Sequence, residues 1–228
     1  MITLNVSRFS YCSPGLASPA DWDNWAAGKQ EIALSAENPP MDFSDTERLA
    51  LSPKDFALFK RRLSKITRLT LRVLYDLMPF GDSVKIVFVS FRGEINQQFK
   101  INKSLIEDGE LSPAAFSQSV FNTPPALASI ALGLKAGYTA IYPAKEHFAT
   151  GFMAAASPLL SGREKEIVFV YADELCPPEY QNKEHLTPLA FATLISTECS
   201  GIGISIDHKS LSSPEEFLKY LYNNKAQV

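Results

Sequence analysis

Cysteine and histidine are both scarce in this 228-residue sequence, and their scarcity speaks against several kinds of site. The three cysteines, Cys12, Cys176 and Cys199, show no CxxC spacing, and only three histidines accompany them. This pattern is not a metal-binding signature. An odd, small number of thiols is also not a disulfide framework and suits a reducing compartment. We therefore expect no metal and no cofactor.

Long apolar runs and an excess of basic residues are absent as well. No stretch approaches the eighteen consecutive apolar residues that a membrane-spanning helix needs. Residues 1–8 lack the basic segment and the apolar run of a signal peptide. The formal net charge of −3 argues against a general nucleic-acid-binding protein. We expect a cytoplasmic protein with no membrane span and no nucleic-acid partner.

The remaining composition, 46% hydrophobic and 21% charged, is that of a soluble globular protein. The length suits one domain covering residues 1–228. Helical patterns separate apolar stretches that predict five strands, at residues 2–11, 84–89, 138–142, 167–171 and 201–206. This alternation indicates an α/β fold around a mostly parallel sheet, in which a late strand could be antiparallel.

The longest predicted helix runs from Pro53 to Leu77. Ser52 provides an N-cap, and Pro53 stands in the first turn. Apolar residues then recur at the three-four spacing of one helix face: Phe56, Phe59, Leu63, Ile66, Val73 and Leu77. Further helices are predicted at 94–106, from Ser112, from Asn122 as N-cap, at 147–160 and from Ser213. The polar segment 16–53 is expected to pack onto the body of the domain, because it contains Trp22 and Trp25.

Residues 111–144, LSPAAFSQSVFNTPPALASIALGLKAGYTAIYPA, resemble the N-terminal half of a β-ketoacyl synthase. The similarity rests on Ser112-Pro113, Asn122, Gly133-Leu134 and the strand that leads from Tyr138 to Ala144. It extends to Ser13-Pro14-Gly15, to the Arg61-Arg62-Leu63-Ser64 segment and to Asp173-Glu174 after a buried strand. The resemblance implies half of a thiolase-type fold, with a mixed, mainly parallel five-stranded sheet and flanking helices.

More narrowly, the chain is similar to the short ketosynthase-like proteins of the chain-length-factor or ketosynthase N-terminal-domain type. These occur beside aryl-polyene and related type II polyketide genes. A ketosynthase carries its nucleophilic cysteine at the turn between a strand and a helix, where the helix N-terminus favours a thiolate. Alignment on Gly137-Tyr138-Thr139 places that position at Ala144. The family's second catalytic half, with its histidines, would begin beyond the end of this chain.

The resemblance therefore implies a catalytically inactive accessory protein. The alternative is an acyltransferase or thioesterase-like enzyme that uses Glu146 and His147 as acid and base. A histidine beside an acid at a helix start also forms local hydrogen bonds without any catalytic role. A pocket ending at Ala144 and His147 would favour the enzyme, and a filled core would favour the accessory protein.

A run of basic residues without an acid lies between residues 60 and 72. Within the predicted helix, Arg61, Lys65, Arg68 and Arg72 fall on one stripe, where like charges repel one another. The resemblance places Arg61 and Arg62 where ketosynthases have a basic pair that docks the acidic acyl carrier protein. The stripe is thus a candidate docking site for a carrier protein, or else a solvated face or a set of internal ion pairs.

A lone half of a thiolase-type fold leaves surfaces uncovered, and exposed apolar patches of that size usually mark a partner. The resemblance implies dimer formation along the strand at 138–142, where Ala140 is expected at an outward position. The expected partners are an acyl carrier protein and either a catalytic ketosynthase or a second copy of this chain. A purely structural subunit without acyl contact remains a third interpretation.

Overall fold

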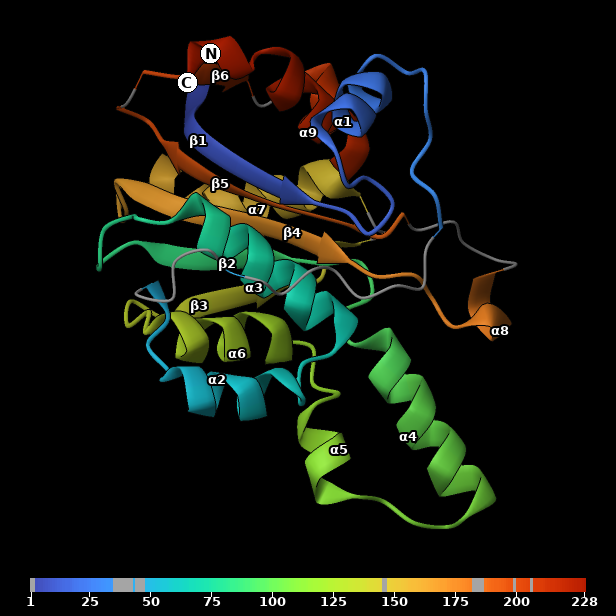
Figure 1. The fold of residues 1–228 in the computed structure, drawn as a ribbon. Helices are drawn as coiled ribbons and strands as arrows, with labels where there is room; N and C mark the ends of the chain where they lie inside the picture. Colours follow the sequence, from blue (N-terminus) through green and yellow to red (C-terminus); the bar gives the residue numbers. More distant parts are fainter. Residues whose placement is uncertain are drawn as a thin grey trace.

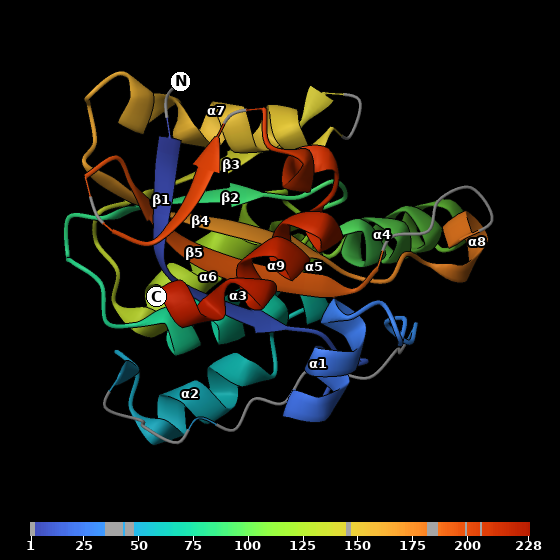
Figure 2. The same ribbon diagram turned by 90° about the horizontal axis from the view of Figure 1, so that it is seen from above.

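The computed structural model describes residues 3–34, 43, 48–144, 147–181, 187–198, 200–205 and 207–228. In these residues one six-stranded sheet, in the order β3-β2-β4-β5-β1-β6, lies between two layers of helices (Figures 1 and 2). The strands are β1 (Thr3–Cys12), β2 (Lys85–Val89), β3 (Tyr138–Ile141), β4 (Glu166–Asp173), β5 (Leu189–Ser196) and β6 (Ile202–Ser205). The edges of the sheet are β3 and β6.

The sheet is mixed, as the resemblance implies, but its pairing is less parallel than expected. Strand β2 pairs in parallel with β3 and with β4. The pairs β4/β5, β5/β1 and β1/β6 are antiparallel. Four of the six strands therefore run in one direction, but three of the five described pairings are antiparallel.

The prediction of five strands is wrong, because the sheet has six and the sequence analysis missed β5. Residues 189–196 read LAFATLIS, and all eight are buried between β4 and β1. Alanine and leucine favour helices more than strands in isolation. Tertiary burial overrides that preference here, since Ala190 and Ala192 pack into the cluster on one face of the sheet and Phe191 packs into the cluster on the other. The other five predicted strands are confirmed within one to two residues.

One helical layer consists of α2 (Pro53–Lys60), α3 (Lys65–Leu77) and α6 (Thr123–Leu132). Helix α3 packs across β1, β4 and β5 and contacts α6. Its core cluster joins the buried face of α3 to one face of the sheet, including Ile66, Leu74, Phe88 and Val170. Helix α2 forms the outer part of this layer and contributes mainly Phe56 to the core cluster.

The opposite layer consists of α7 (Phe148–Leu160), α9 (Pro214–Asn223) and α1 (Pro19–Ala26). Figure 2 shows α7 across the sheet from α3. Phe148, Phe152 and Phe217 form ring contacts with one another and with Phe169 of β4. Trp22 and Trp25 of α1 are buried in the same cluster, which confirms that the described residues 16–34 of the polar segment pack onto the domain.

The single long helix expected between Pro53 and Leu77 is wrong. The first helix ends at Lys60, and a second helix starts at Lys65 with Ser64 as its N-cap. The hydroxyl of Ser64 accepts a hydrogen bond from the backbone N–H of Thr67 at 3.1 Å. A serine inside a helical pattern can offer such a cap, and this cap outweighs the continuous apolar spacing.

A helical arm projects from the body and is formed by α4 (Ile95–Glu107) and α5 (Pro113–Ser117) (Figure 1). None of the thirteen residues of α4 is buried. The short helix α8 (Pro178–Gln181) lies beside α4 in both ribbon views. In the described part of the chain no helix is both long enough and apolar enough to cross a bilayer.

Candidate functional site

The turn between β3 and α7 is where the resemblance places a nucleophile. It contains the buried Pro143 and the exposed Ala144, and α7 begins at Phe148 after the exposed His147. The carbonyl of Ala144 accepts a hydrogen bond from the backbone N–H of His147 at 3.3 Å. The methyl group of Ala144 has no lone pair that could attack a carbonyl, so this position cannot carry an acyl group.

His147 is the N-cap residue of α7, but its side chain makes no capping hydrogen bond. Its backbone carbonyl accepts from Thr150 and Gly151 at 3.0 and 3.2 Å. Glu146, the other member of the alternative acid–base pair, lies outside the described residues. The geometry of a Glu146–His147 pair is therefore not part of the described site.

The space behind this turn is filled. Gly151 packs so closely that a Cβ there would lie 2.9 Å from Pro143 Cγ and from Val89 Cγ1. One turn away, Phe148 is only 1% exposed and lies within 6.0 Å, centroid to centroid, of Phe169 in β4. The described side chains therefore pack closely behind the turn.

The basic residues between 60 and 72 do not form the expected stripe, because they belong to two helices and the turn between them. Arg61 and Arg62 lie in that turn and are exposed, whereas Lys65 begins α3. Within the described residues, the guanidinium groups of Arg61 and Arg62 have no hydrogen-bond or ion-pair partner. They are the two basic residues of this segment that an acidic partner could reach most freely.

Arg68 and Arg72 have intramolecular roles. Arg68 donates hydrogen bonds to the carbonyls of Lys60 at 2.9 Å and Leu63 at 3.2 Å. Arg72 pairs with Asp76 at 2.7 Å and lies over the ring of Phe43.

The charge of Lys65 lowers the pKa of the buried Glu174, which burial raises overall. Internal pairing, one of the alternatives left open by the sequence, thus describes Arg72.

A buried polar network at the carboxyl ends of β2 and β4 was only partly foreseen from Asp173-Glu174. Asp173 accepts hydrogen bonds from Ser90 Oγ at 2.7 Å, from the hydroxyl of Tyr171 at 2.5 Å and from the backbone N–H groups of Phe91 and Arg92, both at 3.0 Å. Burial raises the pKa of Asp173, and these hydrogen bonds partly offset the shift. The network fixes the loop that leads into α4.

Apart from the two acids, no residue pattern indicates this network, because its donors are a serine, a tyrosine and two backbone amides. Every residue except proline carries a backbone N–H, so the residue type does not show which of these groups will donate to a side chain. Among the described residues, no group of three or more histidine, cysteine or acidic side chains could hold a metal ion.

Strand β3 forms a sheet edge that no described strand covers. Thr139 is exposed there, whereas Ala140 is half-buried against the α3/α6 cluster. The expectation that Ala140 points outward is therefore wrong. Asn122 also differs from its expected role, since its side chain caps nothing and instead donates to the hydroxyl of Tyr138 at 3.1 Å. This bond ties the base of the arm to the sheet edge.

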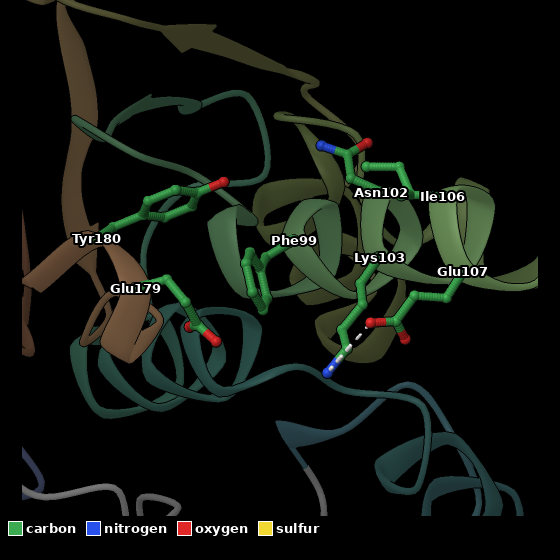
Figure 3. A pocket seen from close by; sticks show the side chains of 7 residues that line it. All are labelled: Phe99, Asn102, Lys103, Ile106, Glu107, Glu179 and Tyr180. Atoms are coloured by element: carbon green, nitrogen blue, oxygen red, sulfur yellow. Dashed lines mark ion pairs between the residues drawn. The ribbon is translucent and has the colours of Figure 1, made fainter.

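The arm carries apolar side chains that the described chain leaves uncovered. The most exposed are Leu105 (50%), Ile106 (83%), Leu111 (48%) and Phe116 (56%). A groove of about 450 Å³ separates α4 from α8 (Figure 3). It is lined by Phe99, Asn102, Lys103, Ile106, Glu107, Glu179 and Tyr180.

The ring of Phe99 meets that of Tyr180 edge-on at 5.5 Å, so the groove walls are held by one aromatic contact. Exposed apolar area of this kind usually marks an interface.

Comparison with solved structures places this architecture among ketosynthases. The ketosynthase ApeO in complex with its chain length factor ApeC from Xenorhabdus doucetiae matches at a TM-score of 0.68 and 23% identity, over 86% of this chain and 79% of the matched chain. The ishigamide ketosynthase/chain length factor matches at 0.63 and 12% identity, over 85% of this chain and 62% of the other.

Ketosynthase twelve of the bacillaene polyketide synthase in Bacillus amyloliquefaciens matches at a TM-score of 0.54 and 14% identity, over 86% of this chain but only 41% of the other. At these identities the likeness shows the thiolase-like fold. The comparison with curated proteins found no match. A family model described as the N-terminal domain of β-ketoacyl synthase matches residues 22–221. The chain therefore belongs to the β-ketoacyl synthase N-terminal-domain family.

Proposed function

We propose that this chain is a catalytically inactive, ketosynthase-like accessory subunit that works by binding partners. The observation that carries the proposal is the turn before α7, where the exposed Ala144 stands in place of a nucleophile. The aromatic packing of Phe148 and the close approach of Gly151 to Pro143 fill the space behind it. A chain that cannot form a thioester but keeps the fold retains the fold's other use, which is assembly.

The proposed system is a type II polyketide or fatty-acid-like pathway, and the sequence resemblance favours an aryl polyene pathway. The chain would act there as a single cytoplasmic domain, for which thiols that form no disulfide, such as those of Cys12 and Cys176, are suited. Two of the matched structures are described as a ketosynthase with its chain length factor. Their names support a ketosynthase as the partner of this chain.

Two surfaces support the assembly. The free edge of β3 offers unpaired backbone groups, and an uncovered strand edge is a template for pairing with another chain. The arm lies next to it, because Asn122 at the base of α6 bonds Tyr138 of β3, and the ring of Phe121 lies 6.4 Å from that of Tyr142. A second thiolase-fold subunit that pairs with β3 would also meet the apolar side chains of the arm.

An acyl carrier protein is the second proposed partner. Arg61 and Arg62 are exposed in the turn between α2 and α3, and neither is used by the fold. An acidic protein would gain contacts that are individually weak but that raise the association rate at low salt. Arg68 and Arg72 are not proposed as direct contacts to the carrier protein, because their side chains already bind the carbonyl of Lys60 and the carboxylate of Asp76.

Affinity purification of the tagged chain from its own host tests the proposal. We expect a ketosynthase in the eluate, and a carrier protein when the salt concentration is low. Intact mass spectrometry of the same sample should show the chain without an acyl adduct. Recovery of an acylated chain would contradict catalytic inactivity, and recovery of the chain alone at its monomer mass would contradict the accessory role.

A further inference from the structure

Helix α4 has less tertiary packing than the other long helices of this chain. None of its thirteen residues is buried, whereas every other described α-helix of eight or more residues buries at least one side chain. A helix of about this length is only marginally stable in water when tertiary packing does not support it. Packing against a partner would therefore stabilise α4.

The uncovered face of α4 forms one wall of the groove between α4 and α8. Phe99 and Ile106 lie on this face two helical turns apart, and Tyr180 belongs to the opposite wall. Figure 3 shows the side chains of Glu179 and Tyr180 extending from α8 toward this face. Ile106 is 83% exposed, the highest value among the large hydrophobic residues of the described chain. The groove thus has apolar walls with an anchor point at Ile106.

The length and the walls of the groove suit a helix better than a strand. Its lining on α4 extends from Phe99 to Glu107, which is about 12 Å at the helical rise of about 1.5 Å per residue. Two turns of an amphipathic helix cover this length and place apolar residues at the i, i+3 or i+4, and i+7 positions. A strand would find no ladder on α4, because the backbone groups inside a helix are already bonded to one another.

The rim of the groove carries more negative than positive charge. Glu107 and Glu179 lie on opposite walls, and Lys103 is the one cation among the described lining residues. The ammonium group of Lys103 lies 3.9 Å from the carboxylate of Glu107, which it partly neutralises. Glu179 is exposed and has no ion-pair partner among the described residues. A rim of this kind attracts a lysine or arginine and repels an acidic surface.

We propose that the groove between α4 and α8 binds an amphipathic helix of a partner protein that carries aliphatic side chains on one face and a lysine or arginine beside them. The aliphatic side chains pack against Phe99, Ile106 and Tyr180, and the cation pairs with Glu179. An acidic carrier protein does not fit this groove, because the rim repels it. The groove shares no residue with the β3 edge or with the turn of Arg61 and Arg62, so this inference goes beyond the proposed function.

Two synthetic peptides serve as probes. Each is a fluorescein-labelled amphipathic helix of about eighteen residues with leucine on its apolar face, and the polar face carries lysine in one peptide and glutamate in the other. Fluorescence anisotropy measures the affinity of each peptide for the full chain at low salt. We expect the lysine peptide to bind at least about tenfold more tightly than the glutamate peptide. Equal affinities, or no binding of the lysine peptide, would overturn the proposal.

The variant Ile106→Asn tests the apolar contact. Because Ile106 is so exposed, its replacement removes little packing from the free chain. We expect this variant to bind the lysine peptide at least about tenfold more weakly than the wild type, since an apolar anchor is lost. The control Ile130→Asn changes a residue of α6 that is 55% exposed, and it should bind like the wild type. Equal affinities of the two variants would show that the peptide binds elsewhere.

The variant Glu179→Lys tests the charge of the rim. We expect the affinity for the lysine peptide to fall about fivefold at low salt and the affinity for the glutamate peptide to rise. The control Glu198→Lys makes the same change of net charge at another exposed position and should have a smaller effect on both affinities. Equal effects of the two substitutions would contradict a specific contact with Glu179.

Hydrogen exchange locates the bound peptide on the chain. We expect the protection of α4 amides, normalised to that of α7 amides, to rise at least about tenfold when the lysine peptide is bound. A bound peptide that leaves the exchange of α4 unchanged would overturn the proposal. None of these measurements needs a ketosynthase or a carrier protein, so their outcomes are separate from those that test the proposed function.

Discussion

Arg68 Nη2 lies 2.9 Å from the backbone carbonyl of Lys60, and the side chain thereby ties the end of α2 to α3. A second bond, from Arg68 Nε to the carbonyl of Leu63 at 3.2 Å, secures the same turn. The last carbonyls of a helix have no partner within it, so a cation that reaches them has a structural role. This contact separates the basic residues used by the fold from those that are free to bind a partner.

Replacement of Arg68 by glutamine is expected to lower the free energy of unfolding by about 1–2 kcal/mol, because hydrogen bonds from a charged donor to the two carbonyls are lost. Urea unfolding at neutral pH measures the change. The matched controls Arg61→Gln and Arg62→Gln alter exposed residues and should stay within about 0.5 kcal/mol of the wild type. A similar loss in all three variants would show that the whole basic segment is structural.

The double variant Arg61→Glu/Arg62→Glu is expected to bind an acyl carrier protein at least about tenfold more weakly at low salt, since both exposed contacts become repulsive. The difference should shrink near 0.5 M salt, where the Debye length is only about 4 Å. Binding measured by biolayer interferometry at several salt concentrations tests this expectation. The exposed Lys135→Glu on the loop before β3 serves as the control for net charge, and equal weakening there would remove the special role of the turn.

The variant Ala144→Cys is expected to react with iodoacetamide in the folded protein faster than Cys12 and Cys176 do. An exposed thiol just before α7 lies near a helix N-terminus, which favours the thiolate. Burial raises the pKa of Cys176, and that of Cys12 to about 11, so both remain thiols at neutral pH. Peptide mapping after short reaction times compares the sites. Protection of residue 144 would show that the turn is closed.

Offered acyl and malonyl carrier proteins, neither the wild type nor this variant is expected to release carbon dioxide. The turn alone supplies no group that decarboxylates the extender. Acylation of the wild type would contradict the reading of Ala144 as an inactive position.

Tyr171→Phe is expected to lower the free energy of unfolding by about 1–3 kcal/mol, because a buried donor to Asp173 is removed at a distance of 2.5 Å. The loss of this donor should also raise the pKa of Asp173 further, since the remaining donors then stabilise its carboxylate alone. Thermal unfolding compares the variant with Tyr220→Phe, whose hydroxyl bonds the carbonyl of Gly203 at the half-buried α9 surface. A smaller effect at Tyr171 than at Tyr220 would contradict the importance of the Asp173 network.

Local sequence signals predicted most elements of this fold. The capping residues Ser52, Ser112 and Ser213 marked the starts of three helices, and each accepts the expected backbone hydrogen bond. Apolar stretches separated by helical patterns predicted five strands. What could not be predicted depends on contacts between distant segments, such as the burial that makes LAFATLIS a central strand.

In the candidate site, too, local sequence signals predicted some features, and contacts between distant segments decided others. The position of Ala144 followed from the resemblance, and the structure places it at the expected turn. The division of the basic stripe could not be predicted, because it depends on Ser64 capping a new helix and on Arg68 reaching back to Lys60. The burial of Glu94 was equally hidden, because its hydrogen-bond partners Ser64 and Thr67 lie 30 and 27 residues earlier in the chain.

The central claim, that this chain works as a partner-binding subunit through the β3 edge, is tested most directly by light scattering of the chain alone and mixed with the ketosynthase of its host. We expect a dimer or a stoichiometric complex at micromolar concentration. The variant Thr139→Glu should shift the assembly toward monomer, because a charge on an exposed edge position opposes strand pairing. The control Thr150→Glu, an exposed position on α7, should assemble like the wild type. A wild-type chain that stays monomeric both alone and with the ketosynthase would contradict the claim.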